Sequence, residues 1–323
     1  MKKQIIRVGT VIATLVILFI GYRFFFGVQA VEIDESEQEA KISSYAHPES
    51  FITPKELKEM LDNDEDVVVI GTLNPTLGDL AIDGSFTMWR DDYSANEEDY
   101  DYEGMLPEQS KMEEILSSYG ASPESTIVVY ASNAHHDAAR LWWQIKVLGH
   151  EKVRYLDGGL NAWVGEGYPT SNEVPQVEAS HYIAPNPSDL LLATFEDVEN
   201  ALESDIQLID TRAEDEETGE TIKSGAFGAG KILGSTWINW TSAVNDDSLL
   251  KTRSELEEIY GEFEGQEVIT YCQSGVRSAH TLFVLTQALG YEDVRNYDGS
   301  WIEWSYKHYE EKEQEAVIEN GNE

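Results

Sequence analysis

The chain contains a single cysteine, Cys272, whose surroundings give it the features of a reactive thiol. The β-rich run Glu267–Tyr271 precedes it, and the helix-favouring run Ser278–Leu289 begins after the loop Cys272-Gln-Ser-Gly-Val-Arg277. Backbone N–H groups of such a loop, together with the N-terminus of the helix, converge on the sulfur and favour a thiolate and a nearby anion. The sequence therefore predicts that Cys272 is a nucleophile, with Gly275 allowing the tight turn of the loop.

Composition excludes several classes of site and partner. One cysteine rules out an intrachain disulfide and a multi-cysteine metal site, and the adjacent His135 and His136 seldom converge on one ion, so neither metal nor cofactor is expected. The net charge of −39 repels nucleic acid and anionic lipid headgroups. Such an acidic surface is typical of an adaptation for solubility or of a surface that docks other proteins.

The N-terminal segment predicts an extracytoplasmic protein. Residues 1–30 combine a basic start, the apolar run Val8–Ile20 and the small-residue site Val28-Gln-Ala30, which is typical of a signal peptide or of an N-terminal membrane anchor. Either interpretation places the acidic body outside the cytoplasm, with this segment as its one membrane contact. The acidic residues 31–48 are predicted to form a linker.

The remainder of the chain repeats itself. Gly149–Trp163 matches Gly290–Trp304 without a gap, at a constant offset of 141 residues. Because strands alternate with helices in each copy, we predict an α/β fold with two tandem domains, each a mainly parallel sheet with helices on both faces. The predicted domains are residues 49–172 and 191–312. Residues 173–190 are the interdomain linker and residues 313–323 a disordered acidic tail.

The two copies differ where chemistry is expected. The second copy carries four reactive or charged side chains that the first replaces by Ala, His, Ile and Thr: Cys272, Arg277, Asp210 and Arg212. Their joint absence from the first copy predicts a single active site, in the second domain.

These residues resemble a known family. The segments that carry the likeness are Leu208-Ile-Asp-Thr-Arg212, Gly230-Lys-Ile-Leu-Gly234, the Cys272 loop and the two Asp-Gly segments that end at Trp163 and Trp304. In this order and duplicated, they resemble the two-domain rhodaneses, the thiosulfate and 3-mercaptopyruvate sulfurtransferases, from about Thr53 to Tyr309. The resemblance implies an inactive first domain, a catalytic second domain and no cofactor.

The resemblance also implies a mechanism. The Cys272 thiolate takes the sulfane sulfur of an anionic donor such as thiosulfate, and a thiophilic acceptor (cyanide, a thiol or an acceptor protein) removes it from the resulting persulfide. Arg212 is expected to face the sulfonate of the donor, because a guanidinium suits an oxyanion. The expected binding residues are Arg212, Arg277 and the loop residues Gln273, Ser274, Gly275 and Val276, with Asp210 and Ser278 as loop support.

Alternatives remain open for one residue and for the reaction. Arg277 either binds the donor or stabilises the thiolate, or it closes the loop through an ion pair with Asp210 or Glu216. A 3-mercaptopyruvate sulfurtransferase is a second candidate, although the acidic residues 213–217 would repel a carboxylate. A non-catalytic, surface-anchored persulfide carrier or binding module is a third. A phosphatase is disfavoured, because four residues separate Cys272 from Arg277 where related phosphatase loops have five.

Overall fold

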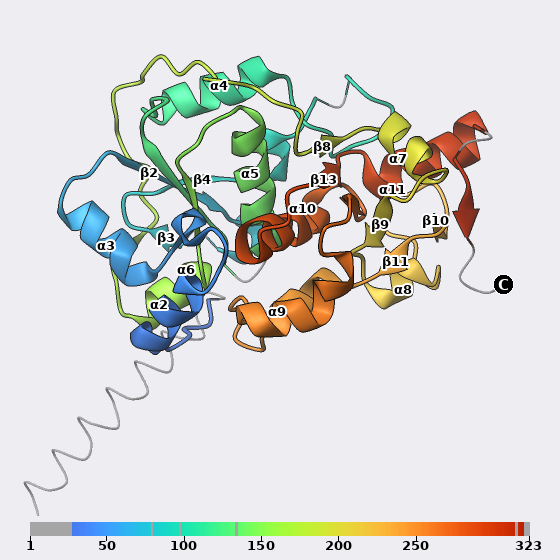
Figure 1. The fold of residues 1–323 in the computed structure, drawn as a ribbon. Coiled ribbons are helices and arrows are strands. Elements are labelled where there is room, and N and C mark those ends of the chain that lie inside the picture. Colours follow the sequence, from blue (N-terminus) through green and yellow to red (C-terminus); the bar gives the residue numbers. More distant parts are fainter. Residues whose placement is uncertain (1–27, 79, 97, 133–134, 314–315, 320–323) are drawn as a thin grey trace, which may run out of the picture.

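The computed structural model describes residues 28–323, apart from residues 79, 97, 133–134, 314–315 and 320–323. Figure 1 shows two α/β units side by side. The predicted signal or anchor lies almost entirely outside the described residues. Among the residues that the structure does describe, no helix is long and apolar enough to cross a bilayer.

The first domain is a five-stranded sheet with surrounding helices. Its first long helix has a capped N-terminus, since the Thr53 hydroxyl accepts a hydrogen bond from the Glu56 N–H and Pro54 takes the first helical position. The strands are β1 (Phe51–Ile52), β2 (Val67–Thr72), β3 (Ala81–Ile82), β4 (Phe86–Met88), β5 (Thr126–Tyr130), β6 (Val153–Leu156) and β7 (Thr170–Ser171). The helices are α3 (Pro54–Asp62), α4 (Gln109–Ser118), α5 (His135–Val147) and α6 (Gly159–Gly165), with short turns η1 (Pro48–Ser50), η2 (Pro75–Leu77) and η3 (Arg90–Tyr93).

The second domain repeats this plan. Its strands are β8 (Leu192–Ala193), β9 (Gln207–Asp210), β10 (Lys231–Ile232), β11 (Thr236–Trp237), β12 (Val268–Tyr271), β13 (Val294–Tyr297) and β14 (Ile318–Glu319). Its helices are α7 (Phe195–Ala201), α8 (Glu214–Glu217), α9 (Arg253–Tyr260), α10 (Val276–Phe283) and α11 (Ser300–Tyr306). The short turns are η4 (Trp240–Ala243) and η5 (Gly261–Phe263), and π-helical turns η6 (Val284–Leu289) and η7 (Lys307–Glu311) extend α10 and α11.

Strand order confirms the duplication. The first sheet runs β1-β6-β5-β2-β4 and the second runs β8-β13-β12-β9-β11, with parallel pairing throughout both. Each domain adds one antiparallel pair, β3 with β7 and β10 with β14. The predicted α/β class is therefore confirmed, and the carboxyl end of β12, where Cys272 follows, is an edge at which parallel sheets commonly bind ligands.

The two domains share one hydrophobic core. The helices α5 and α10 lie side by side between the sheets (Figure 1). Phe283 of α10 packs into the first domain, with ring centroids 4.9 Å from Trp142, 4.8 Å from Tyr155 and 5.0 Å from Phe51. Because α10 starts directly after the Cys272 loop, this packing turns the loop toward the first domain.

Residues 31–48 differ from the predicted linker. The helix α2 (Glu35–Ser43) lies within them, capped by Asp34, and Ile42 is buried in the shared core. Lys41 donates hydrogen bonds to the Asp157 carboxylate at 2.6 Å and to the Leu250 carbonyl at 2.9 Å, so the segment joins both domains. The acidic residues that suggested a linker occupy the solvent side of an ordered helix.

The predicted disordered tail is also partly ordered. The strand β14 pairs with β10, Ala316 is fully buried, and the Trp304 indole N–H donates to the Val317 carbonyl at 3.1 Å. The burial of Ala316 and the pairing of β14 with β10 therefore outweigh the acidic composition of this segment. Residues 173–190 contain neither helix nor strand.

Candidate active site

The Cys272 loop is a tight turn that requires glycine. Gly275 has a φ of +71° and directly precedes α10. A Cβ at this position would lie 2.6 Å from Nη1 of Arg140 and 2.8 Å from the Asp298 carbonyl oxygen. The loop is therefore closely packed against a first-domain arginine as well as against its own domain.

Ser300 holds the loop closed. Its hydroxyl accepts hydrogen bonds from the Cys272 N–H at 3.2 Å and from the Gly275 N–H at 2.9 Å, and donates to the Tyr297 carbonyl at 2.7 Å. The predicted N–H cradle is thus smaller than expected, because the Gly275 N–H is already occupied. The sequence carries a signal for this residue, since the repeat has Asp-Gly-Gly in the first copy and Asp-Gly-Ser in the second.

The environment of Cys272 favours a thiolate. The residue is 1 % exposed, and this burial raises the pKa of its thiol. The Arg277 charge, the Ser278 hydroxyl and the N–H groups of Ser278 and Ser274 act in the opposite direction and bring the pKa of Cys272 below its ordinary value. The Ser278 hydroxyl is buried with no nitrogen or oxygen partner among the described residues, so it is available to the sulfur.

Arg277 makes the predicted loop-closing ion pair and also lines the cavity. Its Nη1 and Nη2 donate to the Glu216 carboxylate at 2.5 and 2.8 Å, so an ion pair does close the loop, onto Glu216 and not Asp210. The same side chain lines the cavity beside Cys272. Glu216 is 2 % exposed and fixes the guanidinium in place.

Arg212 does not face the cavity, contrary to the sequence prediction. Its guanidinium, 1 % exposed, donates to the Asp210 carboxylate at 2.6 to 3.0 Å and to the Gly230 carbonyl at 2.9 Å. Its Cζ also lies 4.8 Å from the Trp301 ring centroid. An acid two residues earlier satisfies this arginine inside the domain, so it holds the β9 region and does not meet a donor.

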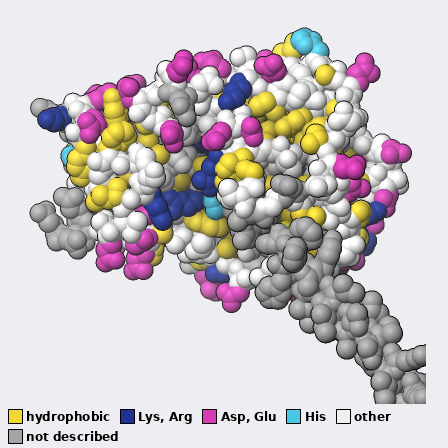
Figure 2. Space-filling view, turned by 180° about the vertical axis from the view of Figure 1, so that it is seen from behind, with side chains coloured by type: hydrophobic (Ala, Val, Ile, Leu, Met, Phe, Trp, Pro, Cys, Tyr) yellow, Lys and Arg dark blue, Asp and Glu magenta, His cyan; other side chains and the backbone are white. Residues whose placement is uncertain are grey.

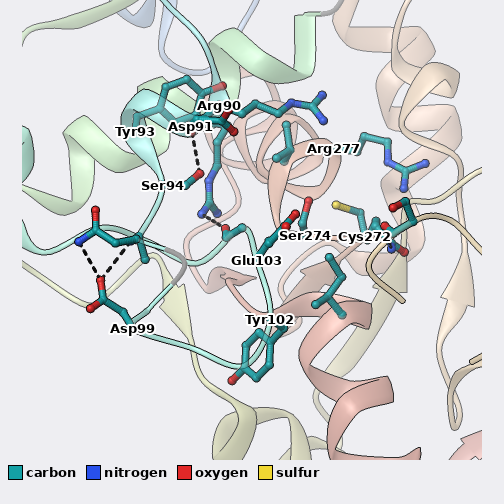
Figure 3. Close-up of a pocket in the computed structure, with 18 of the residues that line it drawn as sticks. Arg90, Asp91, Tyr93, Ser94, Asp99, Tyr102, Glu103, Cys272, Ser274 and Arg277 are labelled. Atoms are coloured by element: carbon teal, nitrogen blue, oxygen red, sulfur yellow. Dashed lines mark hydrogen bonds between the residues drawn. The ribbon is translucent and has the colours of Figure 1, made fainter. Parts of the chain in front are cut away.

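Cys272 opens into a cavity of about 1200 Å³ between the domains. Second-domain residues Gln273, Ser274 and Val276 line it with Cys272 and Arg277, and Figure 3 shows the sulfur pointing into this space. The first domain contributes the segment 90–104 and side chains from α4 and α5, among them Arg90, Lys111, His136 and Arg140. Figure 2 shows a cluster of Lys and Arg side chains beside a His near the middle of one face, with Asp and Glu scattered around it.

The first domain is therefore part of the site, which the sequence comparison of the two copies did not reveal. Arg140, in the middle of α5, donates to the Asp298 carboxylate at 2.6 Å and to the Gly104 carbonyl at 3.0 Å. It connects the first domain, the segment 90–104 and the Cys272 loop. A lone arginine inside the otherwise apolar helix run Ala138–Trp143 was the available sequence signal.

No arrangement for a metal appears in the described part of the chain, where no three His, Cys, Asp or Glu side chains are grouped to hold an ion. His280 is fully buried in α10 with its ring 5.3 Å from that of Trp240, and burial lowers its pKa to about 3. It is a neutral core residue.

Comparison with known proteins agrees with this arrangement. A model of the rhodanese-like domain matches residues 53–166 and 194–307. A putative thiosulfate sulfurtransferase of Haloferax volcanii is 40% identical over 59% of this chain and 70% of its own length. The sulfur carrier protein TtuD of Thermus thermophilus is 32% identical over 80% of this chain and 95% of its own.

Solved structures share the fold at low identity. An anaerobic ergothioneine biosynthesis enzyme from Chlorobium limicola has a TM-score of 0.73 at 22% identity, covering 86% of this chain and 71% of that one. The crystal structure of YnjE has a TM-score of 0.69 at 22% identity, covering 81% and 67%. Two matched domains and a cysteine loop in the second of them lead to one conclusion: the chain belongs to the rhodanese family of sulfurtransferases.

Proposed function

We propose that this protein is a thiosulfate sulfurtransferase that works through a Cys272 persulfide. The observation that supports the proposal most directly is the position of the Cys272 sulfur, which opens into a cavity that also contains Arg277 and Arg90. A thiolate stabilised by a fixed guanidinium is a competent nucleophile, and the same cavity offers cations to an anionic donor.

The proposed reaction has two displacements. The Cys272 thiolate attacks the outer sulfur of thiosulfate, the S–S bond breaks, and its electron pair leaves with sulfite. The acceptor thiolate or cyanide then attacks the terminal sulfur of the persulfide, and the Cys272 thiolate leaves. The second displacement regenerates the enzyme without a redox partner, and Arg277 stabilises the sulfur anion before and after each step.

A persulfide carrier is the second candidate. A cavity of about 1200 Å³ is far larger than thiosulfate needs, so it leaves room for a large acceptor. One relative is a sulfur carrier protein, which fits this reading. Turnover of thiosulfate and cyanide by the purified protein alone would count against the carrier.

The acidic segment that was expected to repel the carboxylate of 3-mercaptopyruvate lies outside the cavity. The acidic residues 214–217 form α8, where Glu216 pairs with Arg277 and Glu217 with Lys231 at 2.7 Å. Neither glutamate lines the cavity, so α8 does not repel a carboxylate donor directly. Thiosulfate stays the proposed donor, and 3-mercaptopyruvate is the donor to compare with it.

Incubation of the full-length protein with thiosulfate is expected to add one sulfur atom to the Cys272 peptide, as measured by mass spectrometry after the donor is removed. Cyanide should remove this sulfur and yield thiocyanate, and Cys272→Ser should acquire none, because it lacks the thiolate. An unmodified Cys272 that still reacts with iodoacetamide would overturn the thiosulfate assignment. The same incubation with 3-mercaptopyruvate would then identify the donor.

Salt is expected to accelerate the reaction with thiosulfate. A protein of net charge −39 repels a dianion at long range, and salt screens this repulsion more than the short contacts inside the cavity. We expect kcat/KM to rise about threefold between roughly 10 and 200 mM NaCl, over which the Debye length falls from about 30 to below 10 Å. The rate of Cys272 alkylation by neutral iodoacetamide is the control, and a kcat/KM that falls with salt would contradict the prediction.

A further inference from the structure

The Lys and Arg side chains that line the cavity are Arg90, Lys111, Arg140, Lys223 and Arg277. Lys223 is exposed on the loop after α8, and the other four differ in how far they are held by hydrogen bonds. Arg140 is buried, and three acceptors take its hydrogen bonds: the carbonyl oxygens of Gly275 and Gly104 and the Asp298 carboxylate. Lys111 donates to the carbonyl oxygens of Asp91 and Ser94. Arg277 uses both terminal nitrogens on Glu216. Each terminal nitrogen of these three side chains therefore already has a hydrogen-bond partner within the protein.

Arg90 is held differently. Its Nε donates to the Asp137 carboxylate at 2.7 Å, and its Nη2 donates to Nε2 of His136 at 3.3 Å. Its Nη1 has no hydrogen-bond partner among the described residues, and 41% of the side chain is exposed to the cavity and solvent. The guanidinium is therefore oriented through Nε and Nη2, while Nη1 is left available to a ligand.

The two residues that hold Arg90 are fixed themselves. Asp137 is fully buried at the start of α5, and the His136 ring packs 4.5 Å from Trp240 of the second domain. Burial and the Arg90 charge keep the pKa of His136 well below its usual range, so its ring is neutral and Nε2 can accept a hydrogen bond from Nη2 of Arg90. Asp137 and His136 are therefore held in place by packing, and their contacts fix the orientation of the Arg90 guanidinium.

The internal repeat relates the residues that hold Arg90 to residues of the Cys272 loop. At the offset of 141 residues, His136 and Asp137 occupy the places of Arg277 and Ser278 in the catalytic copy. Arg277 and Ser278 act on the Cys272 sulfur, whereas His136 and Asp137 hold Arg90. The first-domain loop has lost the nucleophile but still serves the same cavity, across the domain interface.

We propose that Arg90 is the anchor for the anionic end of the sulfur donor, supplied by the first domain in the role that the sequence assigns to Arg212. Asp137 and His136 are positioning residues that aim it. Arg277 stabilises the attacking Cys272 thiolate, and Arg90 binds the oxyanion that leaves. The inference deepens the proposed function, since it assumes an anionic donor, but it concerns anion binding and not the identity of that anion.

The single cysteine makes a direct test possible. Iodoacetate and iodoacetamide both alkylate Cys272, differ in charge, and report the same thiolate, so the ratio of their rates isolates anion binding from the thiol pKa. In full-length Arg90→Gln we expect the iodoacetate rate to fall about tenfold, as for the loss of one hydrogen bond to a charged group. The iodoacetamide rate should stay within about twofold. The ratio thus falls, and Arg90→Lys should restore part of it.

Two further variants control for stability and for net charge. Arg90→Gln leaves the buried Asp137 without its partner, so Arg90→Gln combined with Asp137→Asn removes the orphan charge and should give the same lowered ratio. Arg154 of the first domain pairs with Glu56 outside the cavity, and Arg154→Gln should leave the ratio unchanged. The proposal would be overturned if the ratio of iodoacetate to iodoacetamide rates stayed unchanged in Arg90→Gln and in the double variant. An equal fall of this ratio in Arg154→Gln would also overturn it.

Thiosulfate kinetics separate this inference from the proposed function. We expect Arg90→Gln to raise KM for thiosulfate about tenfold with a smaller change in kcat, as for lost ground-state binding. If wild-type protein takes no sulfur from thiosulfate but the alkylation ratio falls in Arg90→Gln, the donor assignment fails and the anion anchor stands. If thiosulfate loads Cys272 with the same KM in both proteins, the anchor fails and the donor assignment stands.

Discussion

Replacement of Arg277 by methionine is expected to slow persulfide formation at neutral pH by about 100-fold, the usual effect of removing one donor from an anion-stabilising site. Among the groups around Cys272, the Arg277 charge opposes burial most strongly in setting its pKa, so without it only the hydrogen bonds from Ser278 and Ser274 lower that pKa. The thiolate forms as the pH rises through the pKa. The pH profile of iodoacetamide alkylation should therefore move to higher pH in Arg277→Met.

Glu216 provides the matched control. Glu216→Gln frees the Arg277 guanidinium from its counter-charge, so the alkylation profile should move to lower pH, opposite to Arg277→Met. The double variant leaves no buried orphan carboxylate and should still show the upward displacement. Profiles that coincide with wild type in both single variants would show that Arg277 merely closes the loop.

Replacement of Arg212 by methionine is expected to lower the free energy of unfolding by about 3–5 kcal/mol, because it leaves the fully buried Asp210 carboxylate unpaired. Tyr271 also donates to this carboxylate at 2.9 Å, but a phenol cannot replace a positive charge. Urea unfolding measures the loss. The folded fraction should keep its KM for thiosulfate, since Arg212 does not line the cavity.

A charge-balanced variant distinguishes a structural role from a binding role. Arg212→Met combined with Asp210→Asn removes both partners and should recover much of the lost stability. A large rise in KM for thiosulfate in that stable double variant would show that Arg212 meets the donor after all. Such a result would favour a rearrangement of the β9 region on binding.

Local chemistry was predictable from the sequence. The Cys272 loop lies between adjacent elements, so the order strand, glycine-containing turn and helix was enough to place its backbone. The constant offset between Gly149–Trp163 and Gly290–Trp304 predicted two domains of one plan, and the two five-stranded sheets do share one strand order.

Competition between partners was not predictable. Arg212 could reach a donor or Asp210, and only the packing under Trp301 decides in favour of the acid. Arg90 and Arg140 precede the cysteine by well over a hundred residues, and no spacing relates them to it. Their approach depends on the packing of α5 against α10, which is a property of the folded pair of domains. Acidic composition likewise concealed the few apolar contacts that order α2 and β14.

The solitary and enclosed thiol has a consequence for oxidative damage. A Cys272 sulfenic acid would find no second thiol in its own chain with which to form a protective disulfide. Its repair depends on a reducing thiol that enters through the interdomain cavity, the same passage that admits a sulfur acceptor. Reduction of an oxidised Cys272 and sulfur transfer from its persulfide would therefore both depend on access through the interdomain cavity.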